Sequence, residues 1–158
     1  YIICNDYMYN ELKNIKVPTT IMTNSAENNG NIFGAVDYLS HKKDIIDTGV
    51  TIKEYEGGIS YHGKSMTIDD DIAIVGSFNM DMRSAYIDTE LMLVINSKDI
   101  NKQLKASMEE YEKKAATVKN ETEYSHIPEG MKMKELSDKK KNIKAWFGWA
   151  MNGLRFLF

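Results

Sequence analysis

The sequence has few of the residues that cross-link a chain or restrict its backbone. It contains one cysteine, Cys4, and two prolines among 158 residues. A single cysteine cannot form an internal disulfide, which excludes a disulfide-rich scaffold and favours a reducing compartment. With only ten glycines as well, collagen-like and low-complexity chains are excluded. No apolar run approaches the roughly 18–20 residues that cross a bilayer, so we expect no membrane-spanning helix.

The remaining composition is that of a single folded domain. Hydrophobic residues make up 42% of the chain and charged residues 27%, and 158 residues suffice to bury a core. The chain opens with Tyr1, and residues 1–4 already have the pattern of a strand. We therefore expect it to be a portion of a longer protein.

Charge is distributed unevenly along the chain. The net charge is −3, but residues 131–158 carry +5 and residues 1–130 carry −8. Lysine and arginine contacts to phosphates supply most nonspecific affinity for nucleic acid, so a nucleic-acid partner is not expected for the acidic part. The basic end has the charge to bind an anionic surface.

Alternating strand and helix patterns predict an α/β fold with a mixed central β-sheet flanked by helices. The expected strands cover residues 17–23, 50–55, 60–68, 71–75 and 86–96, and the expected helices cover residues 31–48 and 98–114. Residues 60–68 and 71–75 should form a hairpin whose turn contains Asp69 and Asp70. The polar stretch 116–130 has the composition of a linker.

Residues 131–158 form the last expected element, a basic amphipathic helix. Apolar residues recur there at helical spacing: Ile143, Trp146, Phe147, Ala150, Met151, Leu154, Leu157 and Phe158. One interpretation is a helix that docks on the protein itself. The other is a helix on an anionic bilayer, and its expected membrane contacts are Trp146, Phe147, Trp149, Lys140, Lys141 and Lys144.

The most informative pattern in the chain is H-x-K-x4-D-x6-G-S-x-N. Its six positions are His62, Lys64, Asp69, Gly76, Ser77 and Asn79. On a strand, His62 and Lys64 would point to the same face, and a hairpin return would bring Ser77 and Asn79 alongside. Such groups suit a phosphodiester: lysine and asparagine bind nonbridging oxygens, and histidine attacks phosphorus or transfers a proton.

These six positions resemble the signature of the phospholipase D superfamily. The runs GSFNMDMRSAYIDTELMLVI, TIMTNSAENN and TGVTIKEYEGGISYHGKS are most similar to the C-terminal half of bacterial cardiolipin synthases. The resemblance covers residues 1–115, which we expect to form one catalytic half-domain. Met82 stands where those synthases usually have proline, and Tyr61 where leucine is common before the histidine.

The resemblance implies a mechanism through a phosphohistidine, without metal or cofactor. It implies catalytic roles for His62, Lys64, Ser77 and Asn79, and a place for Asp69 in the motif, where it holds the hairpin turn. Glu90, eleven residues after Asn79, would hydrogen-bond and orient the catalytic imidazole, or lie as a solvated acid on its strand. Candidates for the substrate channel are Arg83 and Ser84, for which helix capping is the alternative.

The chemistry of the family needs two H-x-K motifs, and this chain has one. A missing N-terminal half or a second copy of the chain would supply the other. In two-motif enzymes the resemblance makes His62 the general acid and base, whereas in a homodimer it could be the nucleophile.

The leading hypothesis is a phosphatidyl transferase that forms cardiolipin, peripheral to the cytoplasmic side of the cell membrane, with phospholipid as substrate. A homodimeric superfamily nuclease and an inert membrane-binding or interaction module are the alternatives.

Overall fold

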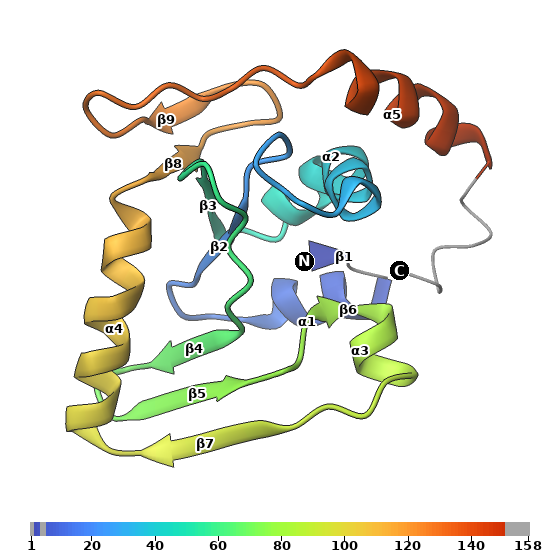
Figure 1. The fold of residues 1–158 in the computed structure, drawn as a ribbon. Helices are drawn as coiled ribbons and strands as arrows, with labels where there is room; N and C mark the ends of the chain where they lie inside the picture. Colours follow the sequence, from blue (N-terminus) through green and yellow to red (C-terminus); the bar gives the residue numbers. More distant parts are fainter. Residues whose placement is uncertain (1, 4–5, 151–158) are drawn as a thin grey trace.

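The computed structural model describes residues 2–3 and 6–150, without the side chains of residues 2–3, 6–8, 82 and 147–150 (Figure 1). The helices are α1 (Asp6–Asn14), α2 (Ile32–Ile46), α3 (Met82–Tyr86), α4 (Lys98–Glu112) and α5 (Asp138–Ala150). The strands are β1 (Ile2–Ile3), β2 (Thr20–Asn24), β3 (Thr51–Tyr55), β4 (Ser65–Ile68), β5 (Ile72–Gly76), β6 (Met80–Asp81), β7 (Met92–Asn96), β8 (Ala115–Val118) and β9 (Tyr124–His126).

The strands form three sheets. One has the order β2-β3-β8-β9, with β2 and β3 parallel and the other pairs antiparallel. The second is antiparallel with the order β4-β5-β7, and β1 pairs with β6 in parallel. Helix α4 contacts strands of both larger sheets and lies along one side of them (Figure 1). The expected mixed α/β class, with helices flanking sheets, is confirmed.

The apolar core lies between α1, α2 and β3. Helix α2 begins where the side chain of Asn31 accepts hydrogen bonds from the N–H groups of Phe33 and Gly34. After its end the chain turns at Gly49, whose φ of 89° favours glycine. The residues packed in the core are Tyr9 and Leu12 of α1, Tyr38 and Ile45 of α2, Val50, and Ile52 of β3.

A buried ion pair joins α2 to the larger sheet. Lys42 Nζ lies 2.8 Å from Glu54 Oε1, and both side chains are at most 4% exposed. The hydroxyls of Tyr38 and Tyr124 also donate to this carboxylate, at 2.6 and 2.5 Å. Burial and the nearby Glu54 raise the pKa of both tyrosines, so both hydroxyls keep the protons that they donate.

Several expected boundaries are wrong. Residues 60–64 and 86–91 lie outside strands: the chain is irregular before β4, and Tyr86 ends helix α3. The expected linker contains β8 and β9 and is therefore partly sheet. β8 is short and β9 is polar, so neither has a clear strand pattern in the sequence. The pairing of buried Ala115 and Ala116 with β3 makes β8 a strand.

The C-terminal segment is helical only from Asp138, and residues 151–158 lie outside the described part of the chain. Helix α5 packs against α2, along the edge of the molecule in Figure 1. Lys140 Nζ donates to the carbonyl oxygens of Ala26, Glu27 and Asn29, at 2.8, 2.6 and 3.1 Å. The expectation that Lys140 contacts a membrane is wrong, because its ammonium binds the protein. None of the described helices is both long and apolar enough to cross a bilayer.

We predict that Lys42→Met lowers the free energy of unfolding by about 3–5 kcal/mol, because it leaves the carboxylate of Glu54 buried without its cation. Urea denaturation measures the loss. Lys43→Met is the matched control: Lys43 pairs with Asp47 at the surface, where such pairs contribute about 0–1 kcal/mol. Equal losses in the two variants would contradict the prediction.

Candidate active site

His62 and Lys64 lie next to each other in the irregular segment that leads into β4. Lys64 Nζ is 3.0 Å from His62 Nε2. The carbonyl of Lys64 accepts a hydrogen bond from the N–H of Gly76, at 3.1 Å. The sequence predicts this pair on one strand. In the structure the two side chains meet although residues 60–64 lie outside the strands.

Ser77 and Glu90 form the second part of the site, between β5 and β7. The Ser77 hydroxyl donates to the carboxylate of Glu90, and the N–H of Leu91 donates to the same hydroxyl at 3.1 Å. At Gly76 a Cβ would lie 2.1 Å from the Leu91 carbonyl oxygen and 2.9 Å from Met92 Cα. The glycine of the motif is therefore required for the close approach that places Ser77 beside Glu90.

Glu90 does not occupy the position expected for it. It precedes β7 rather than lying within the strand, and the partner that it binds is the Ser77 hydroxyl. The expected hydrogen bond to the imidazole of His62 stays a prediction. The role that the structure gives to this carboxylate is to hold Ser77.

Asn79 and Ser84 extend the site toward α3. The N–H of Asn79 donates to Ser84 Oγ at 3.2 Å, and the N–H of Ser84 donates to Asp81 Oδ1 at 2.7 Å. Ser84 and Asp81 are both buried, and Asp81 caps the helix. Among the described residues, Asn79 Oδ1 is buried and has no hydrogen-bond partner. This oxygen is a free acceptor at the edge of the cluster.

The electrostatics of the cluster favour a neutral imidazole. Burial, together with the positive charge of Lys64, lowers the pKa of His62. Burial also lowers the pKa of Lys64, against the opposing effect of the carboxylates of Glu90 and Asp81. Hydrogen bonds from Ser77 and Ser84, and the charge of Lys64, lower the pKa of Glu90. The site therefore holds an unprotonated histidine, a lysine and an ionised carboxylate.

Two of the expected site residues lie elsewhere. Asp69 is in the β4–β5 turn, at the opposite end of the hairpin from Lys64, with a φ of 48°. Lys105 holds this turn by donating to the Asp69 carbonyl and to the Asp70 carboxylate. Arg83 forms an exposed ion pair with Asp88, at 3.1 Å. Within the described part of the chain, this hydrogen bond and this ion pair join the two residues to Lys105 and Asp88, outside the cluster.

The sequence analysis missed Asp81. The negative charge of its carboxylate favours the charged form of Lys64. The same carboxylate caps α3 and thereby positions Ser84. An aspartate three residues before a serine, at the start of a short helical run, is a recognisable capping signal. That signal was available in the run DMRSAY.

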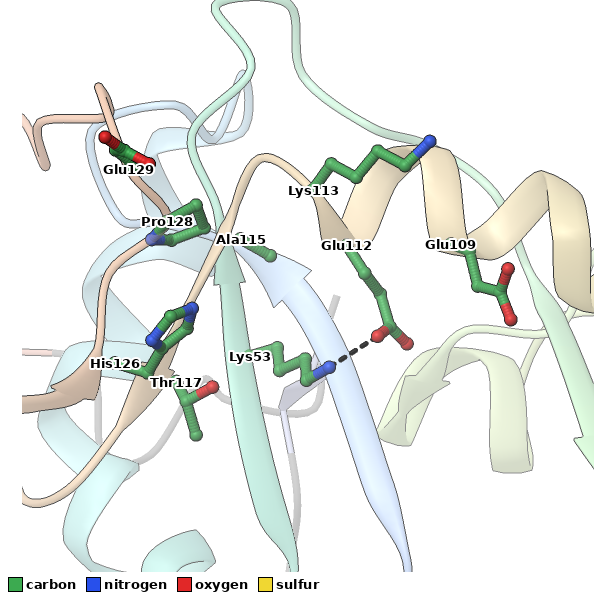
Figure 2. Close-up of a pocket in the computed structure, with 9 residues that line it drawn as sticks. All are labelled: Lys53, Glu109, Glu112, Lys113, Ala115, Thr117, His126, Pro128 and Glu129. Atoms are coloured by element: carbon green, nitrogen blue, oxygen red, sulfur yellow. Dashed lines mark hydrogen bonds and ion pairs between the residues drawn. The ribbon is translucent and has the colours of Figure 1, made fainter.

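An open depression of about 460 Å³ lies elsewhere on the surface of the described structure (Figure 2). It lies over β3 and β8 beside the end of α4, and an ion pair between Lys53 and Glu112 crosses it. None of the residues that line it belongs to the H-x-K and G-S-x-N cluster. Within the part of the chain that is described, no group of three potential metal-ligating side chains occurs.

A family model described as "Cardiolipin synthase, PLD-like domain" matches residues 2–111. The chain belongs to this family. The matched region contains the whole of the cluster and ends within α4. The phospholipase-D-like domain therefore accounts for the three-stranded sheet and its candidate site.

Within the aligned segments, curated relatives are about one third identical to this phospholipase-D-like chain. Cardiolipin synthase 1 of Staphylococcus epidermidis is 36% identical over 97 residues, which are 61% of this chain and 19% of that protein. Cardiolipin synthase A of Wigglesworthia glossinidia brevipalpis is 35% identical over 68 residues, which are 43% of this chain and 14% of that protein. The matched segments thus span less than a fifth of these relatives.

A solved structure confirms the fold. The phosphatidylserine synthase of Haemophilus influenzae superposes with a TM-score of 0.56 at 16% identity, covering 83% of this chain and 33% of that one. At this identity the similarity concerns the fold alone.

We predict that Lys64→Met raises the pKa of His62 toward its ordinary value of about 6.5, because the substitution removes a neighbouring positive charge. Titration of the His62 Cε1–Hε1 signal by NMR measures the change, and His62→Asn identifies the signal among three histidines. Lys64→Arg keeps the charge and should leave the pKa low. A pKa unchanged in Lys64→Met would show that the lysine does not control this imidazole.

Proposed function

We propose that this chain supplies one of the two histidine sites of a phosphatidyl transferase or phosphodiesterase that acts on phospholipid headgroups. The observation that carries the proposal is the contact between Lys64 and His62, beside the Ser77–Glu90 pair. Catalytic roles are assigned to His62, Lys64, Ser77 and Asn79. Glu90 holds the serine, and Asp69 belongs to the motif only as a turn residue.

The protonation of the imidazole suits this chemistry. A lysine ammonium can only donate, so its contact with Nε2 places the lone pair on that nitrogen and the proton on Nδ1. When a phosphodiester binds, the ammonium moves to a nonbridging oxygen and exposes the Nε2 lone pair to phosphorus. The serine hydroxyl and the asparagine amide supply further hydrogen bonds to the phosphate oxygens as its charge develops.

The reaction takes place in two displacements. In the first, one histidine forms a nitrogen–phosphorus bond while the bond from phosphorus to the leaving headgroup oxygen breaks. The histidine of the second H-x-K motif gives its proton to that leaving oxygen. In the second displacement the same histidine removes a proton from the incoming alcohol or water. The oxygen of that molecule then bonds to phosphorus as the nitrogen–phosphorus bond breaks. A neutral His62 fits the attacking role directly. In the other role it must first carry the proton that it gives to the leaving oxygen, and it becomes neutral before it removes a proton from the incoming alcohol or water.

The substrate class follows from the relatives and from charge. The curated relatives are named for cardiolipin synthesis, and the structural neighbour for phosphatidylserine synthesis. The −8 charge of residues 1–130 opposes binding of a polyanion such as DNA. A phospholipid, with one phosphodiester and a small headgroup, fits both observations.

The proposed partners are a second H-x-K half and an anionic membrane surface. The proposed sources of the second half are a longer polypeptide that contains this chain and another copy of the chain. For the membrane, Trp146 is 63% exposed on α5, and Lys141 and Lys144 are also exposed. These exposed side chains support the proposal of a peripheral membrane enzyme, for which the cytoplasmic side of the cell membrane stays the expected location.

We predict that His62→Asn lowers the formation of cardiolipin from phosphatidylglycerol by about 100-fold or more, because it removes the nucleophile or the proton carrier. The assay uses the protein with both motifs present, in mixed micelles, with lipids quantified by mass spectrometry. His126→Asn on β9 is the control and should retain activity. Full activity in His62→Asn would contradict the proposal, and cleavage of single-stranded DNA without lipid turnover would favour a nuclease.

For the membrane surface, we predict that Lys144→Gln weakens binding to vesicles with 30% phosphatidylserine about fivefold, since each lysine near an anionic surface contributes about 1 kcal/mol. Vesicle co-sedimentation measures the affinity. Lys43→Gln, which removes an exposed lysine from α2, should not change it. Equal affinities for Lys144→Gln and the unaltered chain would remove α5 from the membrane contact.

A further inference from the structure

The side-chain amide of Asn24 binds the main chain directly before the candidate catalytic histidine. Asn24 Oδ1 accepts from the N–H of Tyr61 at 2.7 Å, and Asn24 Nδ2 donates to the carbonyl of Tyr61 at 2.8 Å. The amide thus pairs with Tyr61 as a neighbouring strand would. Asn24 is the last residue of β2 and is 6% exposed.

The loop that follows Asn24 binds the two preceding residues as well. Asn28 Nδ2 donates to the carbonyl of Ile59 at 3.2 Å and to Asn24 Oδ1 at 3.3 Å. The N–H of Gly30 donates to the hydroxyl of Ser60 at 3.2 Å. Residues 59–61 are therefore held to the end of β2 at three consecutive positions, although they belong to no strand.

His62 lies between two backbone anchors. On one side Tyr61 is bound by Asn24, and on the other the carbonyl of Lys64 accepts from the N–H of Gly76. Only two residues separate the anchors, so the direction of the imidazole depends on the peptide planes that the anchors hold. A shift at Tyr61 would carry His62 away from Lys64.

We propose that Asn24 is a positioning residue for His62: its amide fixes the backbone of Tyr61 and thereby the direction of the imidazole. The inference rests on the proposed function for the role of His62. It assigns to β2, more than thirty residues away in the sequence, a part in the phosphoryl-transfer site.

A second contact also holds Tyr61, but it acts on the ring. The Tyr61 ring lies 4.5 Å from the ring of Tyr111 and 6.2 Å from that of Tyr55, measured between centroids. Such contacts keep the ring in place but allow the main chain to rotate, because the energy of a contact between aromatic rings changes little with small changes in their orientation. Hydrogen bonds to both the N–H and the carbonyl are directional and restrict the peptide planes.

The test compares two buried asparagines that bind the main chain at opposite ends of the β4–β5 hairpin. Asn101 is 1% exposed and donates to the carbonyl of Ile72 at 2.6 Å, beside the distal turn. Both Asn24→Ala and Asn101→Ala remove a buried amide and should destabilise the chain. Only Asn24→Ala should change His62.

In Asn24→Ala we expect kcat for phosphatidyl transfer to fall about 10- to 100-fold with KM within about twofold, as for a displaced catalytic group. The pKa of His62, measured by NMR without lipid, should rise toward about 6.5 as the imidazole moves away from the positive charge of Lys64. Asn101→Ala should leave both quantities unchanged.

Asn28→Ala serves as a milder variant if Asn24→Ala does not fold, and should change both quantities in the same direction by a smaller amount. An unchanged His62 pKa and an unchanged kcat in the folded variant overturn the proposal, as does an equal change in Asn101→Ala. The titration needs no activity. If the His62 pKa shifts in Asn24→Ala but the unaltered protein has no phosphatidyl-transfer activity, the positioning role of Asn24 is retained and the proposed function is rejected.

Discussion

The backbone of Gly76 connects the two parts of the candidate site. Its N–H donates to the carbonyl of Lys64, which ties the histidine segment to β5. On its other side, the missing side chain allows the backbone at Leu91 and Met92 to approach β5 closely. Ser77, the next residue, then meets Glu90. A side chain at this position would separate β5 from β7 and pull the serine away from its carboxylate.

This close packing has an electrostatic consequence. It gathers an imidazole, an ammonium and two carboxylates, of which Asp81 is buried and Glu90 is hydrogen-bonded. The carboxylates favour the charged form of Lys64, while burial and the ammonium favour the neutral form of His62. Under the proposed function, the positive charge would bind an anionic phosphodiester, and the unprotonated nitrogen beside it would attack phosphorus.

Local patterns predicted much of the fold, and they were wrong where tertiary contacts decide. The helix expected over residues 31–48 from its local pattern is observed as α2, Ile32–Ile46. β8 is four residues long, and it is a strand because buried Ala115 and Ala116 pair with β3. Likewise Lys140 lies in a basic run typical of a membrane-binding helix. Its ammonium instead binds three carbonyls of the β2–α2 loop, a partner more than a hundred residues away.

The sequence by itself determined the family, because the motif positions lie within 18 residues at fixed spacing and can be recognised without any distant partner. The same motif predicts which residues carry the chemistry. The sequence also determined the mixed α/β class through the alternation of its patterns. Only the tertiary structure decided which groups touch: Glu90 with Ser77, Asp81 near Lys64, and Asn24 with Tyr61. Those contacts depend on sheet register and on the course of irregular segments, and residue order does not encode either one locally.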